Sequence, residues 1–184
     1  MQRVSVVGTT SSGKTTLGRT LAARLRFPCV ELDAINWGPH WTPLDHETFR
    51  ARVAAAITGQ AWVVDGNYGG AGVRDVVWER ADTVVWLDYA FRVVLWRLLV
   101  RTIRRAVTRE ELWSGNRESL RTVFLSRDSI FVWLLRTYWR RRRQFGAAQT
   151  DPAYAHLRWI RLGSPREAER WLASVPPDSP GTSG

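Results

Sequence analysis

The chain has 184 residues, of which 45% are hydrophobic, and a formal net charge of +10. This length fits one domain with a sizeable buried core. The longest apolar stretch, Phe91–Val100, is interrupted by Arg92 and Arg97 and is too short to span a bilayer, which excludes a membrane-spanning protein. The single cysteine, Cys29, excludes an internal disulfide, and we expect it to be buried. We therefore expect a cytoplasmic protein with no membrane partner.

The first predicted elements are a buried strand over residues 3–7 and a helix over residues 16–25, which has leucines four residues apart. Between them, residues 8–15 match the pattern G-x-x-x-x-G-K-[ST] of a phosphate-binding P-loop. In this context Lys14, the sole lysine among 27 basic residues, is expected at the β- and γ-phosphates of ATP, and the Thr15 hydroxyl on Mg²⁺. The predicted ATP contacts are Gly8, Ser11, Ser12, Gly13, Lys14, Thr15 and Thr16. The alternative is a Gly/Ser-rich turn that only caps the helix.

Strands and helices alternate along the rest of the chain, which predicts an α/β fold with a parallel sheet covered on both faces. Further strands are predicted over residues 29–33, 61–66, 83–88 and 157–162. Helices are predicted from an N-cap at Thr42 to about residue 59, over 73–80, from about 89, up to about 145, and from 165 to about 175. Residues 1–175 are thus expected to form a single domain, followed by a disordered tail over 176–184.

The positive charge lies in one segment, between Phe91 and Arg143, which carries 14 arginines and four acidic residues. The rest of the chain is balanced, so the anion that this protein handles is expected to meet that segment. The run Arg140–Arg143 points all round a helix and is interpreted as a solvated basic end, with nonspecific nucleic-acid contact as the alternative.

Two carboxylates, Asp33 and Asp65, each follow a predicted strand. Ligands of parallel α/β sheets bind at the carboxyl ends of the strands, where the P-loop also lies. Asp65 is expected to hold Mg²⁺, the alternative being an Asp-Gly turn. Asp33 is expected to bind an acceptor hydroxyl or accept its proton, the alternative being a plain loop residue.

Aromatic and amide side chains near these carboxylates predict a pocket for a small-molecule acceptor. The expected acceptor residues are Asp33, Asn36, Trp37, Asn67 and Tyr68, with Trp41 as a second candidate for ring stacking. Because the chain has 11 tryptophans, ordinary packing is the alternative for both tryptophans.

The P-loop, Leu32-Asp33, Asp65-Gly66 and Leu87-Asp88 followed by Arg97 and Arg101 resemble the adenylate-kinase-like P-loop kinases. The small family of adenylate kinase-like or DNA topology modulation proteins is the nearest match, and the resemblance covers residues 1–175. It implies a three-layer P-loop NTPase fold, with a five-stranded parallel sheet in the order 2-3-1-4-5 and a helical, arginine-rich lid over about residues 102–136. In that family, arginines placed like Arg97 and Arg101 contact the ATP base and phosphates.

Arg97 and Arg101 are four residues apart and therefore lie on one face of a helix. We expect this face to point to the P-loop, and the alternative is that it is a solvent-exposed surface. Arg117 is expected to close over the phosphates as part of the lid. The predicted catalytic residues are Lys14, Asp33, Asp65, Arg101 and Arg117. Asn67 and Tyr68 stand where adenylate kinases have Phe-Pro-Arg, so AMP is not the expected acceptor.

These features predict an ATP- and Mg²⁺-dependent kinase that acts, as a monomer or homodimer, on a small hydroxylated or phosphorylated metabolite, with nucleosides and nucleotides included. A different class of function stays open, namely a nucleic-acid-binding P-loop ATPase that uses the basic segment over residues 91–143. Nucleotide binding without catalysis is a third possibility.

Overall fold

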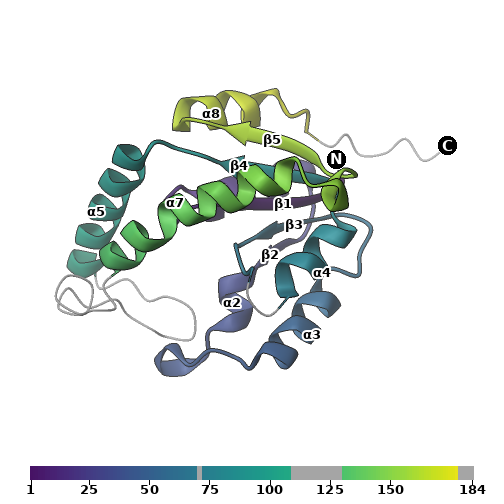
Figure 1. The fold of residues 1–184 in the computed structure, drawn as a ribbon, viewed down its shortest axis with the longest axis horizontal. Coiled ribbons are helices and arrows are strands. Elements are labelled where there is room, and N and C mark those ends of the chain that lie inside the picture. The colour runs from purple at the N-terminus through teal and green to yellow at the C-terminus, as the bar shows by residue number, and fades with distance from the viewer. Residues whose placement is uncertain (70–71, 109–129, 178–184) are drawn as a thin grey trace.

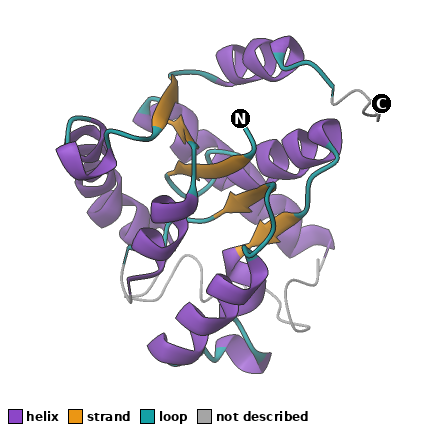
Figure 2. Ribbon diagram, turned by 90° about the vertical axis from the view of Figure 1, so that its right-hand side faces the viewer, coloured by secondary structure: helices purple, strands orange, loops and turns teal. Residues whose placement is uncertain are grey.

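The described part of the chain folds around a five-stranded parallel sheet in the order β2-β3-β1-β4-β5. The computed structural model describes residues 1–69, 72–108 and 130–177. Figures 1 and 2 show helices on both sides of the sheet, which confirms the predicted three-layer architecture and the strand order. Arg117, the middle of the predicted lid and the end of the predicted tail lie outside the described residues.

The elements follow one another as the sequence predicts, with small shifts at their ends. The strands are β1 (Arg3–Gly8), β2 (Cys29–Glu31), β3 (Trp62–Asp65), β4 (Thr83–Leu87) and β5 (Arg158–Leu162). The α-helices are α1 (Lys14–Leu25), α2 (Leu32–Asn36), α3 (His46–Ala56), α4 (Val73–Arg80), α5 (Phe91–Thr108), α7 (Ile130–Gln149) and α8 (Pro165–Ser174). Short 3-10 turns cover Pro39–Trp41 and Pro152–Tyr154.

Each central strand is buried on both faces, as expected for a parallel sheet between helices. Val4 and Val6 of β1 belong to the apolar core that contains α1 and α8, whereas Val7 belongs to the core on the α3, α4 and α7 side. On this second side the Phe145 ring of α7 lies 5.8 Å from the Trp86 ring and 6.3 Å from the Trp78 ring, measured between centroids. These ring contacts hold α7 against the sheet, and Figure 1 shows the helix lying across it.

The chain leaves β2 earlier than predicted. β2 ends at Glu31, and Asp33 lies in the short helix α2 rather than at the end of the strand. The Leu32 side chain is buried against Gly66, where an added Cβ would lie only 2.7 Å from Leu32 Cβ. The turn at Leu32 therefore depends on the missing side chain of Gly66, which the residues of β2 alone do not reveal.

Helix α3 begins after Asp45, not after Thr42. The backbone N–H of Gly38 donates to the Thr42 carbonyl at 2.8 Å, and that of Leu44 donates to the Asn36 carbonyl at 2.9 Å, which holds residues 42–44 outside the helix. The Asp45 carboxylate then accepts from the Thr48 backbone N–H at 2.8 Å and acts as the N-cap. A long-range pairing thus overrides the local capping signal.

Cys29 is exposed, so the prediction of a buried thiol is wrong. The reason is its place on β2, which lies at the edge of the sheet. Within the described residues, no helix combines the length and apolar character needed to cross a membrane.

Candidate active site

The P-loop begins at the end of β1, and its last two residues, Lys14 and Thr15, form the start of α1, which begins two residues earlier than predicted. A Cβ at Gly8 (φ 153°) would lie 2.8 Å from the Leu87 carbonyl oxygen, so only glycine lets the loop leave the sheet here. The hydroxyls of Ser11 and Ser12 are buried and have no hydrogen-bond partner among the described residues. Buried, unpaired donors at a helix N-terminus are suited to phosphate oxygens.

Lys14 is surrounded by charges that act in opposite directions on its pKa. Its Nζ donates to the Thr9 carbonyl at 3.0 Å. Burial lowers the pKa of Lys14, the carboxylate of Asp65 opposes this shift, and the guanidinium of Arg141 adds to it. Asp33 and Arg101 have smaller effects of opposite sign. The two carboxylates and two guanidinium groups balance one another, so the Lys14 ammonium leaves the cluster with a net charge of about +1, which favours an anion.

Thr15 and Asp65 meet beside the P-loop and form the pair expected to hold a cation. The Thr15 hydroxyl donates to Asp65 Oδ2 at 2.5 Å, whereas Asp65 Oδ1 is buried without a hydrogen-bond partner in the described part of the chain. Burial raises the pKa of Asp65, and Lys14 acts against that rise. A hydroxyl and a carboxylate with an unused oxygen fit Mg²⁺, which also takes phosphate and water ligands.

Asp33 is oriented by a chain of side chains from α2 and the loop after β3. The Tyr68 hydroxyl donates to Asp33 Oδ1 at 2.5 Å and accepts from Asn36 Nδ2 at 3.4 Å. The Tyr68 ring packs edge-on against Phe49 of α3, 4.8 Å between centroids. Burial and the Asp33 charge both raise the pKa of Tyr68, so its phenol stays protonated as a donor. This arrangement holds one carboxylate oxygen of Asp33 in place.

Asn67 contacts the P-loop and also lines the cavity described below, so its role as an acceptor residue stays a prediction. Its Oδ1 accepts from the backbone N–H of Gly8 at 3.0 Å, and its Nδ2 donates to the Gly8 carbonyl. Both ends of the amide are thus engaged with the first P-loop residue. The geometry gives Asn67 the task of fixing the loop after β3 against the P-loop.

Trp37 and Trp41 pack against each other, with ring centroids 5.7 Å apart and planes at 81°. Trp37 also forms an isolated backbone bridge with Pro43. Neither residue lines the cavity described below. Stacking of either ring on an acceptor therefore stays a prediction.

Arg97 and Arg101 lie on the side of α5 that faces the P-loop. A Cβ added at Gly13 would lie 2.9 Å from Arg97 Nη2, which places that guanidinium directly against the loop. The charge of Arg101 lowers the pKa of Lys14, so Arg101 also lies close to the phosphate site. The helical spacing of these two arginines thus brings them together as expected.

Arg140, Arg142 and Arg143 of the arginine run on α7 are exposed, as the interpretation of a solvated basic end expects, whereas Arg141 is half-buried. Arg142 pairs with the buried Asp88, Nε to Oδ1 at 3.0 Å, while Arg140 and Arg141 line a cavity. Arg141 is seven residues from the buried Leu134 and seven from the buried Ala148. The seven-residue spacing places Arg141 on the same helix face as these two buried residues. The sequence could therefore have predicted that Arg141 points inward.

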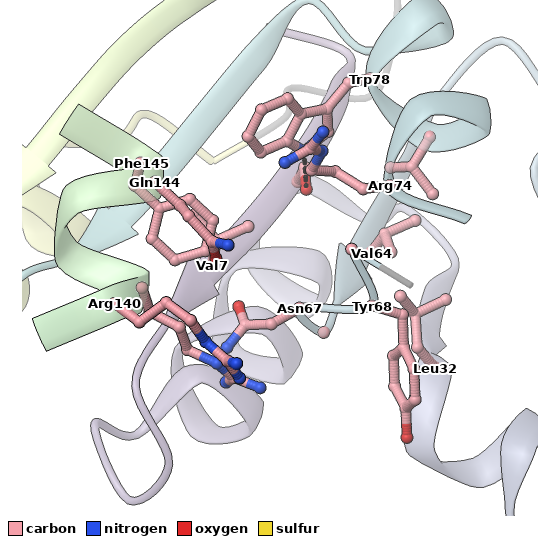
Figure 3. A pocket seen from close by; sticks show the side chains of 15 residues that line it. Val7, Leu32, Val64, Asn67, Tyr68, Arg74, Trp78, Arg140, Gln144 and Phe145 are labelled. Atoms are coloured by element: carbon pink, nitrogen blue, oxygen red, sulfur yellow. Dashed lines mark hydrogen bonds between the residues drawn. The ribbon is translucent and has the colours of Figure 1, made fainter. Parts of the chain in front are cut away.

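The cavity has a volume of about 440 Å³ and lies between α7, α4 and the sheet. Its polar lining comes from the loop after β3 and from the two helices, and its floor from Ser5, Val7 and Val64. Figure 3 shows Arg140 reaching toward Asn67, with Tyr68 on the far side. The cavity therefore adjoins both the P-loop and the Asp33–Tyr68 pair.

No protein-family model matches the chain, and no curated protein sequence matches it. The fold is nevertheless similar to that of several solved kinases. A shikimate kinase from Bacteroides thetaiotaomicron matches with a TM-score of 0.56 at 17% identity, over 94% of each chain. A gluconokinase from Sinorhizobium meliloti 1021 matches with a TM-score of 0.52 at 19% identity, over 94% of this chain and 91% of the other.

A sugar kinase from a Janibacter species is similar to the same extent, with a TM-score of 0.51, 20% identity and coverage of 94% of this chain and 93% of the other. These likenesses show that the chain has the fold of P-loop kinases. Membership of the DNA topology modulation family stays a prediction.

Proposed function

We propose that the protein is an ATP- and Mg²⁺-dependent kinase that phosphorylates a hydroxyl group of a small metabolite. The contact between Thr15 and Asp65 beside the P-loop carries this proposal, because it joins a phosphate-binding loop to a cation site with an unused carboxylate oxygen. The similarity of the fold to that of sugar, gluconate and shikimate kinases supports the same class of acceptor.

Each group in the proposed site has a separate task. The P-loop N–H groups and Lys14 hold the β- and γ-phosphates, while Arg97 and Arg101 compensate the charge on the transferred group. Mg²⁺, when held by Thr15 and Asp65, neutralises part of the phosphate charge. Asp33, oriented by Tyr68, binds the acceptor hydroxyl.

In the proposed reaction, the acceptor oxygen forms a bond to the γ-phosphorus of ATP, and the bond between that phosphorus and the β,γ-bridging oxygen breaks. ADP leaves with the electron pair of the broken bond, and the acceptor proton passes to the Asp33 carboxylate. Positioning and charge compensation supply most of the rate enhancement in this chemistry, so the site needs no covalent intermediate.

The proposal is tested by transfer of labelled γ-phosphate from ATP to pooled sugars, sugar acids, nucleosides and nucleotides. We expect a labelled product with the wild type and with Asp151→Asn, a control at an exposed 3-10 N-cap that asparagine also serves. Asp33→Asn should reduce the transfer rate by at least about a hundredfold, because it removes the base, and should leave MgATP affinity unchanged. Equal rates for the two variants would contradict the role of Asp33, and no product from any pool would contradict the kinase assignment.

A further inference from the structure

A second cationic feature, beside the phosphate site, is the charge of the cavity beneath α7. Two guanidinium groups, those of Arg140 and Arg141, reach it from consecutive positions on one helix, and Arg74 contributes a third from α4. None of the described residues that line the cavity is acidic. A small concave site with cations and no lining carboxylate is suited to an anion.

The three arginines differ in how their charge is balanced. Arg74 pairs with Asp75, Nε to Oδ1 at 3.2 Å, and lies over the Trp78 ring at 5.2 Å from its centroid. Arg141 is the more buried of the two α7 arginines: burial and the neighbouring Arg140 charge lower its pKa to about 10, while the Asp33 carboxylate acts against this shift. An anion bound beside both guanidinium groups would reduce the repulsion between them.

The position of α7 is set independently of these two arginines. Asp88 accepts from Arg161 Nη2 at 2.5 Å and pairs with Arg142, which links α7 to the sheet. The Tyr138 hydroxyl donates to the Tyr89 carbonyl at 2.8 Å. The helix is therefore held so that Arg140 and Arg141 point to the cavity, and they can be replaced without removing these anchors.

The cavity is also correctly placed for the reaction. Tyr68 lines it and donates to Asp33, and the Asp33 charge acts on Arg141. Figure 3 shows the Arg140 side chain and Tyr68 on opposite sides of Asn67. A small molecule can therefore place an anionic group at the arginines and a hydroxyl at Asp33.

We propose that Arg140 and Arg141 bind an anionic group, a carboxylate or a phosphate ester, of the hydroxylated acceptor. This inference rests on the proposed kinase function, for which it names the acceptor class. The planar guanidinium fork matches both anions in a bidentate manner, and two such groups fix the orientation of the acceptor. Neutral polyols would lack this contact and bind more weakly.

The test measures anion binding while the P-loop is filled. The full chain is saturated with Mg²⁺ and the β,γ-imido analogue of ATP, and inorganic phosphate is then titrated in by calorimetry. We expect Arg140→Gln/Arg141→Gln to lower phosphate affinity by about tenfold or more, since hydrogen bonds to charged groups are lost. Arg143→Gln is the matched control, because Arg143 is exposed on the same helix and does not line the cavity. Unchanged phosphate affinity in the double variant would overturn the proposal.

Two further arms make the result specific. The variant Arg140→Lys/Arg141→Lys keeps both charges and so controls for a folding defect in the glutamine variant. It should retain part of the phosphate affinity but lose the bidentate contacts. D-Galacturonate with its methyl ester, and D-glucose 6-phosphate with D-glucose, separate carboxylate from phosphate recognition. If the neutral partner of both pairs bound as tightly as the anion, the proposal would be wrong.

The nucleotide is measured separately. Absence of binding of the ATP analogue to the wild type would contradict the kinase function, whereas normal binding with an unchanged phosphate titration in the double variant would contradict only the anion site. If the double variant lost affinity for the ATP analogue instead of phosphate, Arg140 and Arg141 would belong to the nucleotide site, and the acceptor proposal would fall.

Discussion

The P-loop edge, formed by residues 8–15 with Asp33 and Asp65, and the inner face of α7, formed by Arg140 and Arg141, are both built to meet anions. They differ in how the sequence encodes them. The P-loop comprises eight consecutive residues, and in the proposed function their backbone N–H groups supply most of the phosphate contacts. The α7 face uses side chains that reach the site only because Asp88 and the aromatic core hold the helix across the sheet. A site made of consecutive residues can thus be recognised from the sequence before the fold is known, whereas a site that depends on helix packing cannot.

The largest effect on phosphoryl transfer is expected at the P-loop, where replacing Lys14 by arginine compares an ammonium group with a guanidinium group. Lys14→Arg keeps the charge but replaces a compact ammonium by a planar fork in a crowded loop. We expect phosphoryl transfer to fall by at least about a hundredfold, as measured by single-turnover transfer from labelled ATP. Transfer within about threefold of the wild type would show that charge alone is required there.

The backbone dependence of the P-loop edge is tested by two glycines of the loop after β3. Gly66→Ala should destabilise the fold by about 2 kcal/mol or more, because Gly66 has φ 149° and the new Cβ would lie 2.7 Å from Leu32 Cβ. Gly69→Ala is the matched control, since no described atom lies within 4 Å of its added Cβ. Denaturant unfolding of both variants provides the measurement, and equal losses would contradict the packing argument.

A smaller effect is expected on the pH dependence of stability, because Arg141 of α7 acts on the pKa of Lys14 in the P-loop. The folded chain holds the Lys14 proton less tightly than the unfolded chain does, since burial and the arginines lower the pKa of Lys14 from 10.5. The charged ammonium therefore costs stability at low pH, and wild-type stability rises with pH between the lowered folded-state pKa and 10.5. Lys14→Met removes this cost, so its stability advantage over the wild type should shrink as the pH rises toward 10.5.

Thermal unfolding between neutral and alkaline pH measures this dependence. Arg141→Gln should raise the pKa of Lys14 and so reduce the same pH dependence, whereas Arg143→Gln should leave it unchanged. A stability gap between Lys14→Met and the wild type that does not change with pH would argue against this electrostatic link.

The smallest effect is expected for nucleic acid. Arg140 and Arg141 line the cavity and Arg142 pairs with Asp88, so these three arginines already have contacts on the protein's own surface. We expect filter binding of duplex DNA to be weak and to change little in Arg140→Gln/Arg141→Gln. Submicromolar, strongly salt-dependent binding that this variant abolishes would favour the nucleic-acid ATPase instead.

Much of the fold was predictable from the sequence because local signals and tertiary structure agree. Apolar runs gave the strands, and the P-loop marked the first β–α turn. The errors arose where distant residues decide. Gly66 determines how Leu32 turns, the bridge between Trp37 and Pro43 delays α3 to Asp45, and an edge position exposes Cys29.

The candidate site divides in the same way. Lys14, Thr15 and Asp65 were predicted because a motif and a strand end point to them. The two contacts between the Asn67 amide and Gly8 could not be predicted, because they depend on the distance between two loops. Arg141 was overlooked because a run of four arginines hides the seven-residue spacing to Leu134 and Ala148.

Calorimetric titration of MgATP tests most directly whether the P-loop edge is a nucleoside triphosphate site. The wild type and Arg143→Gln should bind with the same affinity, whereas Lys14→Ala should bind at least about tenfold more weakly, because the buried ammonium contact with the phosphates is lost. A folded wild-type chain that takes up neither MgATP nor MgGTP would contradict the account.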